Sequence, residues 1–173
     1  MSDWFMVTLA GKDQPGIVAQ VTGALYEAGC NLGETSMMRL GGNFGVMLMA
    51  QTDKGAAELE AALQPVADAL GLSLHLEPVD PQLHRHPEPD VCITVHGADR
   101  AGIVAQVTRA AADAGLNILD LESDLGGTED EPVYILHIEG TAAAGVDALR
   151  QALEPLQAGG IKVDVRAIDT LIG

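Results

Sequence analysis

Hydrophobic and polar positions change their spacing along the chain, and each change marks a predicted element. Short, apolar, β-rich runs such as Trp4–Ala10 predict strands, whereas Ile17 to Ala28 repeats apolar residues at helical spacing. Gly29 ends that helix, and Gly41-Gly42-Asn43 predicts a tight hairpin. In the first half the pattern predicts strands at 4–10, 30–40, 44–52 and 72–76, and helices at 17–28 and 57–70.

The second half repeats this order. It predicts strands at 91–96, 116–125, 133–139 and 161–168, and helices at 103–114 and 142–157. A strand–helix–strand–strand–helix–strand unit forms most simply a four-stranded antiparallel sheet with two helices on one face. The predicted fold class is therefore α+β, with two ferredoxin-like βαββαβ units in tandem.

An internal repeat supports this division. The string Gly16–Thr22 recurs unchanged as Gly102–Thr108, at an offset of 86 residues. The same offset aligns Gly11 with Gly97, Asp13 with Asp99, Gly29 with Gly115, and Asn31 with Asn117. Prolines crowd the segment between the two copies, which cannot hold a helix or an interior strand. We expect domains at 1–80 and 90–173, joined by a proline-rich linker at 81–89.

The negative net charge of the chain disfavours direct recognition of some classes of binding partner, nucleic acid above all. The formal net charge is −16, of which residues 1–89 carry −7 and residues 90–173 carry −9. Because nucleic acid binding depends on neutralising phosphates with Lys and Arg, direct binding of DNA or RNA is not expected. Cys30 and Cys92 form no disulfide framework, and no secretion signal or long apolar span is present in the sequence. These features predict a cytoplasmic protein.

Both copies carry the pattern Gly-x-Asp-x-x-Gly-Ile-Val before a helix, with an Asn where the next strand begins. A helix N-terminus suits a carboxylate, the glycine permits close approach, and an Asp can face an ammonium group. A free amino acid carries both charges. The predicted ligand-binding residues are Gly11, Asp13, Gln14, Pro15, Gly16, Ile17 and Asn31 in the first copy, and Gly97, Asp99, Arg100, Gly102, Ile103 and Asn117 in the second.

Simpler roles stand beside this interpretation. Asp13 and Asp99 could be helix caps, the glycines could serve the turn alone, and the Asn residues could satisfy strand-start backbone. Arg100 with an Asn could form a phosphate cradle of an acyl-phosphate hydrolase, although the first copy has Gln14 at that position. No catalytic triad or phosphate-binding loop is found in the sequence, so we expect no catalytic residues, no metal and no cofactor.

The two loops Asp13–Ala19 and Asp99–Ala105, each followed by Ala-Gly-x-Asn, resemble the ACT domain. The tandem arrangement is similar to the ACT-domain regulators of the glycine cleavage system, which are thought to act on an activator protein rather than on DNA. The resemblance implies binding of a small amino acid, often between ACT domains, and signalling to a partner. One departure is Ala101, where the family usually has Pro.

The resulting hypothesis is a non-enzymatic regulatory protein that senses a small, glycine-like amino acid. It would act by contact with a regulatory partner, either a transcription activator or an enzyme, and have no membrane partner. An eight-stranded composite sheet, within the chain or across a homodimer, would bury exposed strand edges. The alternatives are a regulatory subunit of an enzyme of amino-acid metabolism and, less simply, the acyl-phosphate hydrolase.

Overall fold

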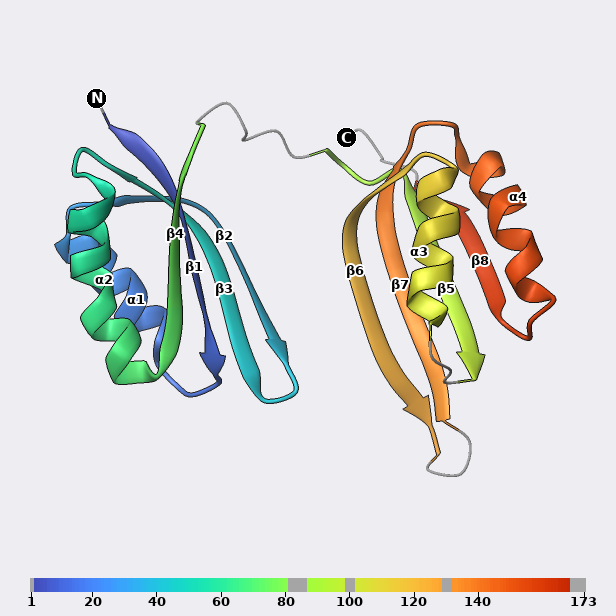
Figure 1. Cartoon of the computed structure of the whole chain (residues 1–173), viewed down its shortest axis with the longest axis horizontal. Helices are drawn as coiled ribbons and strands as arrows, with labels where there is room; N and C mark the ends of the chain where they lie inside the picture. The colour runs from blue at the N-terminus through green and yellow to red at the C-terminus, as the bar shows by residue number, and fades with distance from the viewer. Residues whose placement is uncertain (1, 81–86, 99–101, 129–131, 169–173) are drawn as a thin grey trace. The chain divides into compact units, whose positions relative to one another are not determined.

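The computed structural model describes residues 2–80, 87–98, 102–128 and 132–168. The chain divides into two compact units, Met1–Arg85 and His86–Gly173, here called domain 1 and domain 2 (Figure 1). Residues 81–86 of the predicted linker lie outside the described part of the chain.

Domain 1 has the predicted order of elements. They are β1 (Asp3–Lys12), α1 (Ile17–Glu27), β2 (Asn31–Leu40), β3 (Asn43–Thr52), α2 (Ala56–Leu70) and β4 (Leu72–Val79). The strands form one antiparallel sheet in the order β2-β3-β1-β4. Both helices lie on the same face of that sheet (Figure 1). The predicted ferredoxin-like fold is confirmed.

Domain 2 repeats the topology in the order β6-β7-β5-β8. Its elements are β5 (Val91–Ala98), α3 (Ile103–Asp113), β6 (Leu116–Gly127), β7 (Pro132–Ala142), α4 (Val146–Gln157) and β8 (Lys162–Ala167). The prediction that the last helix starts near Ala142 was wrong. Strand β7 continues to Ala142, and the helix begins only after Gly145, whose φ of 85° turns the chain.

Each core lies between the sheet and its two helices. Alternate residues of β1 point into the first core and are almost fully buried, as Phe5, Val7 and Leu9 show. Ile17 and Val21 of the repeated string pack against them from α1. Ile103 and Val107 occupy the same places in domain 2. The apolar part of the repeat therefore serves packing in both domains.

The helices leave one edge of each sheet uncovered. All ten residues of β2 are exposed, although β3 beside it alternates between buried and exposed positions. In β6 only Leu116 is buried among twelve residues. An uncovered edge strand beside the start of a helix leaves room for a groove, and domain 1 has one at this place.

Candidate functional site

Helix α1 begins at Gly16, which has a left-handed backbone with φ 88° and ψ 0°. Non-glycine residues rarely adopt this conformation, so a glycine is required for the turn. The suggestion that Asp13 caps this helix was wrong, because no side chain of the described residues makes a capping hydrogen bond here. The first N–H groups of the helix therefore face the space in front of it without a side-chain acceptor.

Asp13 instead pairs with a residue from the edge strand. Its Oδ2 lies 2.5 Å from the Nη2 of Arg39 on β2, with the Asp side chain 21% exposed and the Arg side chain 69% exposed. The backbone N–H of Asp13 also donates to the carbonyl of Gly42 at 3.0 Å. These two bonds hold the loop after β1 against the β2–β3 hairpin.

The loop after β1, the start of α1 and the Met37–Arg39 part of β2 line an open groove of about 610 Å³. Phe44 is almost fully buried and lines it with Met37, while Asp13 and Arg39 supply opposite charges. The lining residues are Asp13, Gln14, Pro15, Gly16, Ile17, Val18, Ala19, Met37, Arg39 and Phe44.

The groove matches a small zwitterion in charge. A carboxylate placed before Gly16 would meet the partial positive charge of the α1 N-terminus and the Arg39 guanidinium. An ammonium group would meet the carboxylate of Asp13. Because the helix has no acidic residue in its first turn, nothing on α1 itself competes for this positive end.

Five of the predicted residues of the first copy line the groove, namely Asp13, Gln14, Pro15, Gly16 and Ile17. Gln14 also has a structural contact, since its Nε2 donates to the carbonyl of Leu70 at 2.7 Å and so ties the loop to the end of α2. Gly11 lies apart from the groove lining, where a Cβ would come within 2.7 Å of Leu72 Cδ2. Its smallness lets β1 and β4 approach closely.

The two predicted Asn residues do not join the loops of their own domains. Asn31 pairs in register with Gln51 at one end of the sheet, whereas the loop follows Lys12, which pairs with Asn43 at the other end. Eight residues of strand separate these ends, which is roughly 26 Å. Asn117 lies opposite Thr141 at the corresponding far end in domain 2.

The second copy is described only in part. Asp99 and Arg100 lie outside the described residues, while Gly102 has φ 89° and Ile103 is buried, as in the first copy. Gly97 packs closely, since a Cβ there would lie 3.0 Å from Ile103 Cδ1.

Arg39 was missed by the sequence analysis. Its register partner is Phe44 in domain 1, and at the corresponding position of domain 2 Leu125 pairs with Tyr134. The residue 86 positions after Arg39 is Leu125, so a comparison of the two repeats does not indicate the arginine. Only the strand register brings it beside Asp13.

A metal centre and a membrane-spanning helix are two further kinds of feature that the residues could form. Within residues 2–80, 87–98, 102–128 and 132–168, no group of three or more His, Cys, Asp or Glu residues could hold a metal ion. The linker residues His84 and His86, whose His-x-His spacing could hold a metal ion, lie outside these ranges. No helix in the described part of the chain is long and apolar enough to cross a membrane.

Comparison with known proteins identifies the repeated unit. The family model of the ACT domain matches residues 3–77 and 90–165. The chain is 28% identical over 161 residues to the glycine cleavage system transcriptional repressor of Escherichia coli K12, covering 88% of this chain and 83% of that protein.

Two solved structures share the tandem fold. A protein of unknown function from Galdieria sulphuraria superposes with a TM-score of 0.82 at 23% identity, covering 98% of this chain and 100% of the other. A putative glycine cleavage system transcriptional repressor superposes with a TM-score of 0.72 at 17% identity, covering 98% and 99%. At these identities the similarity shows the shared fold.

Proposed function

The chain belongs to the ACT-domain family, and we propose that it is a non-enzymatic regulatory protein that senses a small amino acid. The observation that carries the proposal is the groove of domain 1, in which Asp13 and Arg39 face each other at the start of α1. Both charges of a free amino acid find a complementary group within this one groove.

Binding would exchange one ion pair for two. In the ligand-free groove, Asp13 and Arg39 neutralise each other. An amino acid inserted between them gives its ammonium to Asp13 and its carboxylate to Arg39 and the N–H groups of α1. Since Arg39 is anchored on the exposed strand β2, its movement would alter that edge of the sheet. The β2 edge is thus the element through which a partner protein could detect whether an amino acid is bound in the groove.

A homodimer would complete the site. If β2 of one copy pairs antiparallel with β2 of a second copy, the Asn31 end of one strand meets the Leu40 end of the other. Asn31 would then lie beside the groove of the second copy, which accounts for its distance from its own loop. Such pairing also removes the exposed edge.

The output is contact with a protein. The net charge of −16 disfavours direct action on nucleic acid. The similar Escherichia coli protein is a transcriptional repressor of the glycine cleavage system, and a glycine-like ligand with a cytoplasmic transcription activator as partner fits that relationship. A metabolic enzyme is the other class of partner that this mode of action allows.

Calorimetric titration of the full chain with free amino acids tests the proposal. At least one small amino acid is expected to bind, and Gly16→Val, which blocks the turn, is expected to abolish the heat. Asn31→Ala should weaken binding only where the protein is dimeric. If no amino acid of the panel binds below the millimolar range, the sensing proposal fails.

A further inference from the structure

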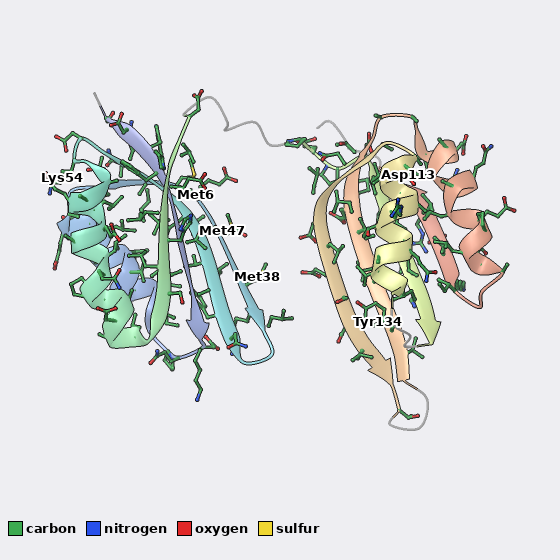
Figure 2. The ribbon with its side chains drawn as sticks, viewed as in Figure 1. Met6, Met38, Met47, Lys54, Asp113 and Tyr134 are labelled. Carbon is green, nitrogen blue, oxygen red and sulfur yellow. The ribbon has the colours of Figure 1, made fainter. Side chains whose placement is uncertain are left out.

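The face of the domain 1 sheet opposite the helices carries a continuous apolar strip, here called the methionine strip. Figure 2 shows Met6, Met38 and Met47 on this side of the sheet, away from α1 and α2. Met6 lies directly opposite Met49, and Met47 lies between Thr8 and Ser36 in register. The strip consists of Trp4, Met6, Met38, Leu40, Met47 and Met49.

Much of the strip is open to solvent. Met38 is 68% exposed, Leu40 72% and Met47 47%, and these are among the most exposed large apolar residues of the described chain. Together with Glu34 and Ser36, three of the methionines surround a shallow hollow of about 240 Å³. A hollow of this kind, lined by flexible thioethers, can accept one large apolar side chain.

The backbone accommodates this packing. Strand β2 changes register between Leu32 and Thr35, which marks a β-bulge. Inside the bulge, a Cβ on Gly33 would come within 2.8 Å of the Trp4 ring and 3.3 Å of Met49 Cβ. Only a residue without a side chain lets β2 pass over the indole at this distance. The Trp4 end of the strip is therefore closely packed.

Domain 2 shows that the fold does not require such a face. At the register positions of Met6, Met49, Met47 and Met38 it has Cys92, Glu139, His137 and Asp124. Three of these four positions are thus polar in domain 2, and two of the three are acidic. An apolar, adaptable face on one copy alone indicates a role in binding.

We propose that the methionine strip is the docking surface for a basic amphipathic helix of a partner protein. This inference rests on the proposed function, because the strip would be the surface through which the regulator contacts its partner. Charge selects the occupant. A second copy laid face to face on the strip would bring the Glu34 and Glu77 carboxylates of both chains together, whereas Lys and Arg flanking an apolar helix face would be attracted to them.

The margins of the strip agree with this occupant. Glu77 on β4 lies directly opposite Met6, and Glu34 lines the hollow on the β2 side. Carboxylates therefore flank the apolar residues on two sides. Trp4 pairs with Gln51 and Leu40 with Asn43, so the strip extends over eight residue steps of β3, or roughly 26 Å, which a helix of about 17 residues covers.

The test uses a synthetic Leu/Lys amphipathic helix of about 18 residues, with a Leu/Glu helix and an Ala/Lys helix as matched probes. Binding to the full chain is followed through the methyl signals of its 6 methionines by nuclear magnetic resonance. The signals of Met6, Met38, Met47 and Met49 are expected to shift with the Leu/Lys helix. Met37, which lines the groove on the opposite face of the sheet, is the internal control.

Substitution separates apolar docking from general attraction. Met38→Glu with Met47→Glu adds negative charge, so a purely electrostatic attraction would increase, yet docking is expected to weaken at least about tenfold. Tyr26→Glu, at a residue 82% exposed on α1, adds charge elsewhere and should not weaken it. Met38→Gln with Met47→Gln should weaken docking without any change of charge.

Three results would overturn the proposal. These are shifts confined to methionines outside the strip, equal affinity for the Leu/Lys and Ala/Lys helices, or self-association of the chain that Met47→Glu abolishes. The last would assign the face to a second copy. Amino-acid titration of the same strip variants should be unchanged, so a failure of helix docking is distinguishable from a failure of amino-acid sensing.

Discussion

In domain 1 the edge strand β2 places Arg39 beside Phe44, next to the start of α1, whereas in domain 2 the edge strand β6 places Leu125 beside Tyr134. The backbone around the two helix starts is nearly the same, with φ 88° at Gly16 and 89° at Gly102. Duplication has therefore kept the turn and the core, whereas an arginine on the edge strand at this position occurs in domain 1 and a leucine in domain 2. The shared residues account for the common fold, and the differing residues are the positions at which we expect the two domains to differ in binding.

The opposite faces of the sheets differ in the same way. Domain 1 has methionines where domain 2 has Cys92, Asp124, His137 and Glu139. Both the proposed ligand groove and the proposed docking surface thus belong to domain 1. The two domains are therefore expected to behave alike in their cores and at their helix starts, and to differ in amino-acid binding.

The largest expected effect is one that the two domains share. Leu63 and Leu153 are both almost fully buried against their sheets. Leu63→Ala and Leu153→Ala should each lower the free energy of unfolding of their own domain by about 3 kcal/mol, because each leaves a cavity. Hydrogen exchange resolved by residue measures both. A loss of less than about 1 kcal/mol in either domain would contradict the equivalence of the two cores.

The next effect should distinguish the domains. Arg39→Leu gives domain 1 the residue type of domain 2 and is expected to reduce amino-acid binding by about 1.5–3 kcal/mol, through loss of a charge-assisted bond. Arg166→Leu is the matched control, because Arg166 also pairs with an Asp at 2.5 Å on the surface, in domain 2. Calorimetry compares the two variants, and equal losses would remove Arg39 from the site.

A smaller effect concerns the two helix starts. Gly16→Ala and Gly102→Ala should each destabilise their domain by about 1 kcal/mol, because alanine is strained in the left-handed conformation. Gly23→Ala is the control within α1, where a Cβ meets nothing within 4 Å, and it should stabilise the domain. Thermal unfolding measures all three. A neutral Gly16→Ala would show that the turn does not depend on glycine.

The smallest effect concerns the tie between the loop and α2. Gln14→Ala removes the hydrogen bond to the Leu70 carbonyl and is expected to cost about 1 kcal/mol in stability. Gln64→Ala removes an exposed bond to Asp68 on the surface of α2 and should cost only a few tenths of a kcal/mol. Chemical unfolding of both variants gives the difference. If the two costs are equal, the loop is not held through Gln14.

Much of the fold could be predicted because it depends on local patterns. Alternation in Phe5, Val7 and Leu9 and helical spacing from Ile17 to Leu25 each record one buried face. The start of α4 was misplaced because alanines at 142–144 favour a helix, while the pairing of β7 with β6 extends the strand to Ala142. Long-range pairing overrode local preference.

The site was predictable only in part, for a similar reason. The start of α1 could be predicted from Asp13 and Gly16, because these residues are close together in the sequence. Arg39 approaches Asp13 only after β2 has paired with β3, and Asn31 is carried to the far end by the same strand. The apolar residues of the methionine strip come from three strands that are distant in the sequence, and only the strand register shows that they form one surface.

The central claim is that domain 1 binds a free amino acid in the groove between Asp13 and Arg39. Backbone amide shifts of the full chain during titration with the best-binding small amino acid test it most directly. We expect changes at Asp13, Gly16 and Arg39, with those at Gly102 and Leu125 remaining small. Equal changes around Gly102 and Leu125, or saturation without any change at Asp13 and Arg39, would contradict it.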